Sequence, residues 1–302
     1  AALFFSAVPV STLTTDNGEI NMQSIGVIGL GRMGSAIARR MQDQGHAVAT
    51  WTRSGRALDV IEAKPDLASL IARSDTLVLS LLNDHAVADV LDVCLACDLS
   101  GKQIIETSTV VPTILQDRIA LIQDKGATAV DAPISGGPEL VAAGACGIFI
   151  GGDDAAAAQA KTTLSAISGR IFHIGPIGTG LVMKTINNSM LQCYVGGLND
   201  MMPLAKRAGI PLEMALNILS GGPAGIPMIA DRIPKILGQD KSVGFTISAG
   251  YKDNNVFQSV VQAYGLTSPM LALSGERQKM ALAEGMGEDD PAALISAAYH
   301  RG

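Results

Sequence analysis

Short apolar runs alternate with helical patterns through the first half of the chain. Strands are predicted for an apolar run that ends near residue 28 and then at 46–51, 75–81, 103–106, 127–131, 148–151 and 171–174. The helical spacing between the strands is clearest at 35–44 and at 153–167, where Asp153 is a suitable N-cap. Strands that alternate with helices in this way are typical of an α/β fold with a doubly wound sheet.

The pattern becomes helical throughout from Gly178 onward. A long apolar helix is predicted over 181–208, ended by Gly209 and Pro211. Shorter helices follow at about 212–220, 225–237, 249–264, 268–285 and 290–300. We therefore expect a Rossmann-type domain over residues 24–178 and an all-helical domain over 179–302, which includes the long interdomain helix.

The long helix is apolar on most of its faces, and such a helix must be buried by its own domain or by a second subunit. This favours a homodimer or a dimer of dimers.

Residues 1–23 are expected to be an extension outside the fold, either disordered or derived from expression. The run from Ala1 to Val10 has no basic residue ahead of it and is a poor signal peptide, although a cleavable targeting segment is the alternative. Met22 stands directly before the first strand, where a natural start would lie.

Composition and charge narrow the range of partners. The 302 residues carry 22 Lys+Arg against 28 Asp+Glu, a net charge of −6, with no basic block. Nucleic acid and anionic membranes are therefore not expected as partners. No run approaches the roughly 18 apolar residues of a membrane span, and we expect a cytoplasmic protein.

Cys94-x-x-Cys97 has no second pair and no nearby histidine, so neither a metal site nor a disulfide framework is predicted.

The most informative motif is a glycine-rich turn between the first strand and the first helix. Gly29, Gly31 and Gly34 form G-x-G-x-x-G in the strand–turn–helix context that dinucleotide binding requires. The first glycine permits the tight turn, the second lets a pyrophosphate approach the backbone, and the third lets helix and strand pack closely. The helix N-terminus adds free N–H groups and a positive dipole end. The predicted cofactor-binding residues of this turn are Gly29, Leu30, Gly31, Arg32, Met33 and Gly34.

The end of the second strand indicates which nicotinamide cofactor to expect. An NAD site places Asp or Glu about 20 residues beyond the glycines, where it accepts a hydrogen bond from the ribose 2′-hydroxyl. Here Thr52 stands in place of the acid, Arg53 and Ser54 follow it, and the next carboxylate is Asp59. A guanidinium binds a 2′-phosphate bidentately, a hydroxyl can assist it, and Arg56 is close in sequence. We therefore predict NADP as the cofactor.

A loop after the predicted strand at 127–131 carries groups suited to a substrate carboxylate. The segment Asp131–Gly137 presents Ser135, Gly136 and Gly137 in succession. Small residues there expose backbone N–H groups beside one hydroxyl, which together can hold an anion.

Polar residues also interrupt the start of the long apolar helix. Asn187 and Asn188 follow Lys184 by three and four residues, so all three lie near one helix face. Hydride reduction of a carbonyl leaves negative charge on its oxygen. A cationic Lys184 can pair with that charge and protonate it, while Asn188 orients the lysine and donates a hydrogen bond.

Together these motifs resemble the β-hydroxyacid dehydrogenase family, which includes 3-hydroxyisobutyrate dehydrogenases, tartronate-semialdehyde reductases and glyoxylate/succinic-semialdehyde reductases. The resemblance runs from about Gln23 to His300 and rests on the glycine turn, on Asp131–Gly137, on Gly178–Asn188 and on Lys252-Asp253. It implies hydride transfer between a nicotinamide cofactor, which the second strand predicts to be NADP, and a small β-hydroxyacid, semialdehyde or short oxo acid.

The resemblance also implies roles for individual residues. Lys184 matches the family's catalytic acid/base, and Ser135 and Asn188 match residues that hold the substrate. Lys252 matches a lysine that reaches the cofactor, and Asp253 matches an acid that helps to organise the cleft. Other matched positions line the nicotinamide half of the site: Leu81, Leu82, Asn83, Ser108 and Thr109.

Departures from the family pattern leave the substrate open. Asn254 and Asn255 follow the Lys-Asp pair where leucine is usual, Leu82 replaces a usual proline, and no arginine flanks Ser135. An imine reductase-like NADPH enzyme is one alternative, although those proteins generally carry aspartate or tyrosine at the position of Lys184. A 6-phosphogluconate dehydrogenase is longer and has a histidine-asparagine pair at the position of Asn187-Asn188. A non-catalytic NADPH-binding module is the alternative from a different functional class.

Overall fold

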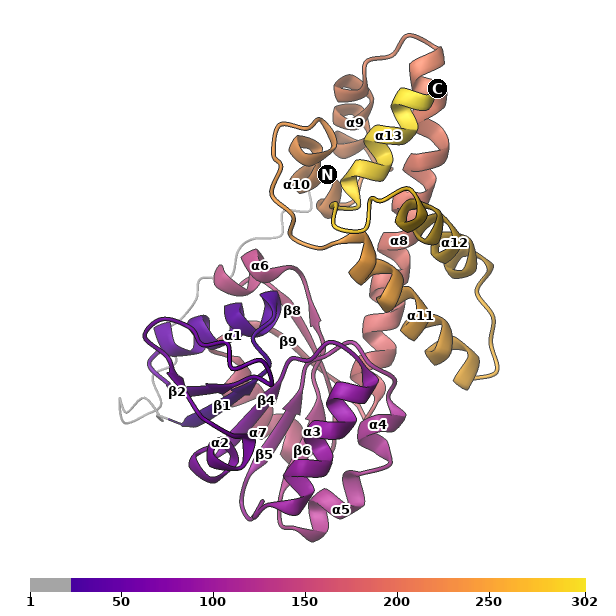
Figure 1. Cartoon of the computed structure of the whole chain (residues 1–302). Coiled ribbons are helices and arrows are strands. Elements are labelled where there is room, and N and C mark those ends of the chain that lie inside the picture. Colours follow the sequence, from indigo (N-terminus) through magenta and orange to yellow (C-terminus); the bar gives the residue numbers. More distant parts are fainter. Residues whose placement is uncertain (1–22) are drawn as a thin grey trace. The chain divides into compact units, whose positions relative to one another are not determined.

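The computed structural model describes residues 23–302, which form two compact units (Figure 1). One unit consists of the described residues up to Ser108 together with Ile114–Gly180. The other consists of Thr109–Thr113 and Leu181–Gly302. Apart from Gln23, the extension predicted over residues 1–23 lies outside the described residues.

The first unit is built on a single sheet. Within the described residues its strands are β1 (Ser24–Ile28), β2 (Ala47–Trp51), β3 (Glu62–Ala63), β4 (Thr76–Leu79), β5 (Gln103–Glu106), β6 (Thr128–Asp131), β7 (Ile134–Ser135), β8 (Gly147–Gly151) and β9 (Arg170–Gly175). Their spatial order is β3-β2-β1-β4-β5-β6-β8-β7, with β9 beside β8. The strands from β3 to β6 pair in parallel, whereas β8 is antiparallel to β6 and β7. The predicted doubly wound α/β class is confirmed.

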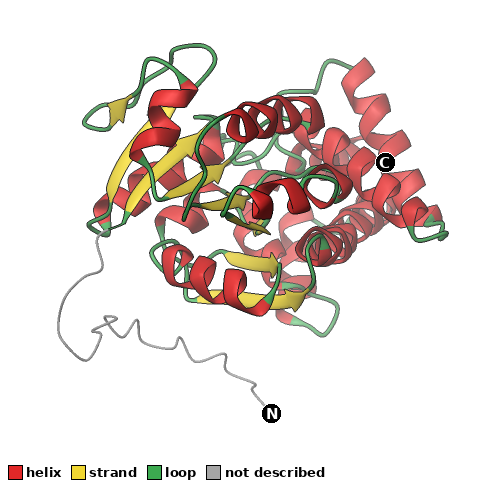
Figure 2. Cartoon of the chain, turned by 90° about the horizontal axis from the view of Figure 1, so that it is seen from below, coloured by secondary structure: helices red, strands yellow, loops and turns green. Residues whose placement is uncertain are grey.

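Helices flank this sheet, as the secondary-structure colouring in Figure 2 shows. They are α1 (Arg32–Asp43), α2 (Leu67–Arg73), α3 (Asp84–Ala96), α4 (Thr113–Gln116), α5 (Ile119–Asp124), α6 (Pro138–Ala142) and α7 (Asp154–Leu164). The apolar side of α1, with Ile37 and Met41, packs on Ile25 and Val27 of β1 in the main core. Asp153 caps α7 as expected, since its Oδ1 accepts the Ala156 N–H at 2.8 Å.

Two strands of the sheet were not predicted. β3 and β7 are each two residues long, which is too short to show an alternating pattern. Because β3 precedes it, the strand predicted at 75–81 is the fourth in the chain.

The second unit contains helices and no strand among the residues described. Its helices are α8 (Thr179–Arg207), whose first two residues belong to the sheet unit, α9 (Leu212–Gly221), α10 (Pro227–Ile236), α11 (Ile247–Ala263), α12 (Pro269–Ala283) and α13 (Ala292–Arg301). Met202 of α8, Leu216 of α9, Ile229 of α10 and Ile295 of α13 form one apolar core. The predicted all-helical domain after the sheet is confirmed. Among the described residues no helix is both long and apolar enough to cross a membrane.

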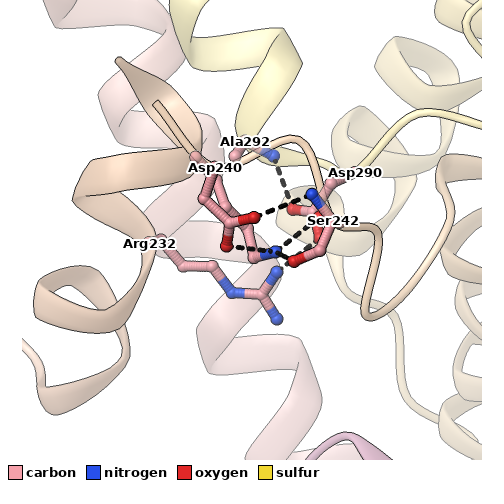
Figure 3. A network of polar contacts seen from close by, with 6 residues as sticks. Arg232, Asp240, Ser242, Asp290 and Ala292 are labelled. Carbon is pink, nitrogen blue, oxygen red and sulfur yellow. Dashed lines mark hydrogen bonds and ion pairs between the residues drawn. The ribbon is translucent and has the colours of Figure 1, made fainter. Parts of the chain in front are cut away.

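Polar contacts fix the loop that follows α10 (Figure 3). Asp240 accepts the backbone N–H of Ser242 at 2.8 Å and pairs with Lys235 at 2.9 Å. The Arg232 guanidinium pairs with the buried carboxylate of Asp290 at 2.6 Å, at the entry to α13. The contacts of Asp240 hold the start of the segment between α10 and α11, and the Arg232–Asp290 pair joins α10 to the entry of α13.

Candidate active site

The glycine turn is shaped by close backbone approaches. Gly29 has φ +96°, and a Cβ there would lie 2.3 Å from the carbonyl oxygen of Ser80. A Cβ on Gly34 would lie 2.0 Å from the Gly29 carbonyl oxygen, whereas Gly31 faces open space. Two of the three glycines are therefore needed for packing, and Gly31 leaves room for a ligand at the start of α1.

A cleft of about 430 Å³ lies beside this turn, within the sheet unit. One side is polar and comes from the segment after β2, with Thr52, Arg53 and Ser54. The other side is apolar and comes from α2 and α3, with Leu67 and Val90 among its residues. Such a cleft suits an adenosine phosphate, with the phosphate on the charged side and the adenine ring on the apolar side.

The segment after β2 is folded back on the glycine turn. The hydroxyl of Thr52 donates to the Arg56 carbonyl oxygen at 3.2 Å and lies 3.4 Å from the Ser54 hydroxyl. The Arg56 guanidinium donates to the Leu30 carbonyl oxygen at 2.9 Å. Thr52 thus shapes the loop at the position where an acid would bind a ribose.

Two guanidinium groups therefore line the polar side of the cleft. Within the described part of the chain no carboxylate pairs with Arg53 or with Arg56, and Asp89, which also lines the cleft, pairs with His85 at 3.1 Å. Guanidinium groups without a carboxylate partner favour an anionic ligand.

The ends of β4 and β5 lie next to each other in the sheet. The Ser108 hydroxyl accepts the Leu81 N–H at 2.8 Å, which ties the two strand ends together. Asn83 caps α3, since its Oδ1 accepts a backbone N–H at 3.0 Å. Leu82 is 75% exposed. The side chains of Ser108 and Asn83 are thus engaged in holding the backbone of this edge.

The predicted anion-binding loop has the backbone that its glycines allow. Ser135 belongs to β7 and pairs with Gly147 of β8. Gly136 has φ +126°, and Gly137 is the N-cap of α6. This loop therefore ends at a helix N-terminus.

In the helical unit, Lys184 lies in the second turn of α8 and is only 7% exposed. Asn187 donates to the Asn188 Oδ1 at 2.9 Å. The neighbouring hydroxyls turn back to their own helix, because Thr185 donates to the Leu181 carbonyl and Ser189 to the Thr185 carbonyl. A buried lysine followed on the same helix by two asparagines has the composition of an oxyanion-binding and proton-donating site.

The Lys-Asp pair of α11 forms a second polar group in this unit. Lys252 Nζ donates to Asp253 Oδ1 at 2.9 Å and to the Thr109 carbonyl oxygen at 2.6 Å. The ammonium group thereby holds the chain just after β5.

Asn254, one of the unusual residues after this pair, is fully buried inside the helical unit. It donates to Gln192 Oε1 at 2.6 Å and to the Leu271 carbonyl at 2.9 Å, and it accepts from Gln258 at 2.6 Å. This departure from the family pattern therefore serves contacts between α8, α11 and α12.

The predicted residues thus fall into two groups. The sheet unit holds the glycine turn, Thr52 to Ser54, Leu81 to Asn83, Ser108 and Ser135 to Gly137, whereas the helical unit holds Thr109, Lys184, Asn188, Lys252 and Asp253. Sequence reasoning missed the apolar side of the cleft. The spacing of Ala86, Val90 and Val93 on α3 is the signal that could have identified it.

The cysteines of the described residues form neither a disulfide nor a candidate metal-binding cluster. All four cysteines are free, and burial raises the pKa of the Cys94 thiol to about 12. No group of three or more His, Cys, Asp or Glu residues that could hold a metal is found within residues 23–302.

Comparison with known proteins identifies the family. Residues 24–175 match the family model described as "NAD binding domain of 6-phosphogluconate dehydrogenase". Residues 178–298 match the model described as "NAD-binding of NADP-dependent 3-hydroxyisobutyrate dehydrogenase". NAD-dependent L-serine dehydrogenase of Pseudomonas aeruginosa is 30% identical over 286 residues, 89% of this chain and 95% of that protein. The chain belongs to the β-hydroxyacid dehydrogenase family.

Two other members of this β-hydroxyacid dehydrogenase family extend the comparison. Mitochondrial 3-hydroxyisobutyrate dehydrogenase of Drosophila melanogaster is 27% identical, with 95% of this chain and 91% of that protein covered. The structure of Mycobacterium tuberculosis 3-hydroxyisobutyrate dehydrogenase with L-serine shares the fold, with a TM-score of 0.82, 24% identity and coverage of 91% and 99%. The protein is thus an NAD(P)-binding oxidoreductase of the hydroxyacid dehydrogenase class.

Proposed function

We propose that this β-hydroxyacid dehydrogenase family member uses NADP to transfer a hydride to or from a small β-hydroxyacid, semialdehyde or short oxo acid, with Lys184 as the acid/base. The observation that carries the proposal is the buried lysine at the start of α8 in a chain of this family. When bound, the nicotinamide supplies or accepts the hydride.

The other groups hold the reactants in this proposal. The Lys184 ammonium pairs with the negative charge that develops on the carbonyl oxygen and gives it a proton; in the oxidative direction the lysine takes the proton back. Asn188 donates a hydrogen bond to the same oxygen or to the lysine. Ser135, Gly136 and Gly137 bind the substrate carboxylate through one hydroxyl and backbone N–H groups.

Residues of both units are assigned to the cofactor. The glycine turn, from Gly29 to Gly34, binds the pyrophosphate at the start of α1. Leu81, Leu82, Asn83, Ser108 and Thr109 are assigned to the nicotinamide half, together with Lys252, and Asp253 is assigned to the substrate cleft.

The preference for NADP rests on the polar side of the cleft. Thr52 is neutral where an NAD site has an acid, and Arg53, Ser54 and Arg56 supply donors for a 2′-phosphate. The Pseudomonas relative is named NAD-dependent, so the cofactor has to be tested directly. Replacing Arg53 with Asp should shift the ratio of kcat/KM for NADPH over NADH toward NADH by about 100-fold, or about 2.7 kcal/mol. A ratio that stays fixed would contradict the NADP assignment.

The lysine assignment is tested with a substrate panel. Oxidation of NADPH is measured with glyoxylate, succinic semialdehyde, methylmalonate semialdehyde, tartronate semialdehyde and a cyclic imine, and reduction of NADP is measured with L-serine. For the substrate that reacts fastest, Lys184→Ala should lower kcat by about 10²- to 10⁴-fold and leave NADPH binding intact. Unchanged turnover would exclude Lys184 as the acid/base. Turnover of the imine alone would support the imine reductase alternative, and NADPH binding without any turnover would support the non-catalytic one.

The assembly expected from the sequence remains a homodimer or a dimer of dimers. Large apolar side chains of α8, including Met190, Met201 and Leu204, are more than half exposed in the single chain, which supports burial by a second subunit. Light scattering coupled to size-exclusion chromatography measures the assembly, and a monomer would contradict it.

A further inference from the structure

The carboxylate of Asp131 is buried at the end of β6, and the proposed reaction assigns it no role. The residue is 0% exposed. Its Oδ1 accepts the backbone N–H of Gly178 at 2.6 Å, one residue before α8 begins. A buried carboxylate is costly unless the surrounding structure satisfies its charge, so this contact requires an explanation.

Glycines on two other segments make room for the carboxylate. A Cβ on Gly151 of β8 would lie 2.3 Å from Asp131 Oδ1, and a Cβ on Gly180 of α8 would lie 2.7 Å from Oδ2. Gly180 also packs against β8, because its Cβ would come within 2.3 Å of the Phe149 carbonyl oxygen. Any side chain at these two positions would displace the start of α8 from the sheet.

These contacts explain the Gly178-Thr-Gly180 sequence. Gly178 has φ +93° and offers its N–H to the carboxylate, while Gly180 lets the first helical turn lie against β6 and β8. A negative charge at a helix N-terminus is also favoured by the helix dipole. The two glycines therefore allow the start of α8 to pack on the sheet, where the Asp131 carboxylate binds it.

We propose that Asp131 is a positioning residue that holds the first turn of α8 and thereby Lys184, which follows one turn later. The inference rests on the proposed function, because it assumes that Lys184 is the acid/base. Lys184 follows Gly180 by four residues, which is about 6 Å along a helix axis. A rigid helix carries any displacement of its first turn to the lysine. Asp131 also precedes Ser135 by four residues, at the end of β6, the strand before β7, which carries that serine.

Asp131 acts through the helix and does not touch a reactant. Its side chain is enclosed by backbone of β8 and of the α8 start, and it is fully shielded from solvent. Loss of the carboxylate should therefore alter the rate of the chemical step and leave the cofactor cleft at the glycine turn unchanged.

A double-mutant cycle tests the proposal with Asp131→Asn, Lys184→Ala and the double variant. Asn keeps one oxygen acceptor, replaces the other carboxylate oxygen with an NH2 donor and removes the negative charge at the start of the helix. We expect kcat to fall by about 10- to 100-fold, as small misplacements of a catalytic group do. The dissociation constant for NADPH, measured by fluorescence titration, should stay within twofold of the wild-type value. In the Lys184→Ala background the same change should lower the residual rate less than twofold, because the group to be positioned is gone.

The matched control is Asp153→Asn. Asp153 caps α7 in the same unit by accepting the Ala156 N–H at 2.8 Å, but α7 carries no proposed catalytic group. This variant should keep the wild-type kcat. If Asp131→Asn does not fold, Gly180→Ala takes its place in the cycle, since it keeps the charge and displaces the helix start.

The outcomes separate this inference from the proposed function. Equal effects of Asp131→Asn in both backgrounds, or no effect on kcat, would overturn the positioning role. Failure of both Asp131→Asn and Gly180→Ala to fold, with Asp153→Asn folded, would also overturn it and assign Asp131 to stability alone. If Lys184→Ala itself keeps full turnover, the proposed function fails, whatever the Asp131 variant does.

Discussion

The sheet unit and the helical unit hold their polar groups in different ways. In the sheet unit the candidate ligand groups follow the carboxyl ends of parallel strands, as Thr52 does after β2 and Ser108 does after β5. Parallel strands bring those ends to one edge, so topology alone gathers the groups. In the helical unit polar side chains project from within helices, and Asn254 meets its partners because α8, α11 and α12 pack against one another.

The first prediction exploits the backbone packing of the sheet unit. Gly34→Ala places a Cβ about 2.0 Å from the Gly29 carbonyl oxygen, and neither backbone segment can yield. We expect a loss of about 3 kcal/mol in the free energy of unfolding, at the upper end for overpacking, together with loss of NADPH binding. Thermal unfolding followed by circular dichroism and a fluorescence titration with NADPH measure the two effects.

Gly31→Ala is the matched variant for this prediction. Its Cβ would enter open space, and φ at Gly31 is −64°, so stability should change little. NADPH should nevertheless bind more weakly, because the methyl group occupies the side on which a pyrophosphate approaches. Equal stability losses in the two variants would show that the glycines do not divide their roles in this way.

The same contrast explains how far the sequence could be interpreted. The strand at 103–106, helices α1 and α7 and the helices of the second unit follow from apolar periodicity and from Gly and Pro signals. Parallel pairing then brings the ends of β1, β2, β4 and β5 to one edge of the sheet. Periodicity could not reveal β3 and β7, which have two residues each. It also could not reveal that Asn254 would be enclosed by Gln192 and Gln258, because those partners come from helix faces whose packing no local pattern encodes.

The second prediction tests the packing of the helical unit. Asn254→Leu removes two donated hydrogen bonds and one accepted bond, and leaves the Leu271 carbonyl and the Gln192 oxygen without this donor. We expect a loss of about 2 kcal/mol in the free energy of unfolding, because buried groups lose their partners. The control is Asn255→Leu, at the adjacent exposed position of α11, which should change stability little. A similar small effect for both variants would mean that the hydrogen bonds of Asn254 add nothing to the free energy of unfolding beyond the packing of a side chain of this size.

The third and smallest prediction compares one kind of turn in the two units. Asp240 in the helical unit and Asp98 in the sheet unit each accept the N–H of a serine two residues ahead, Ser242 at 2.8 Å and Ser100 at 3.0 Å. Asp240 has in addition the ion pair with Lys235, whereas none is found for Asp98 among the described residues.

The hydrogen bond from the Ser242 backbone, with that from Lys235, lowers the pKa of Asp240 to about 2 from an ordinary value of 3.8. A lowered carboxyl pKa stabilises the folded protein fully above the unfolded value, and this contribution disappears as the pH falls from about 4 to about 2. We therefore expect Asp240→Asn to lower the Tm slightly at pH 6, with a difference from wild type that shrinks as the pH approaches 3. Asp98→Asn should give a smaller difference at pH 6. Because the site is exposed, 0.5 M salt should also weaken the Asp240 effect. A Tm difference for Asp240→Asn that is constant between pH 6 and pH 3 would exclude the titration of this carboxylate as its cause.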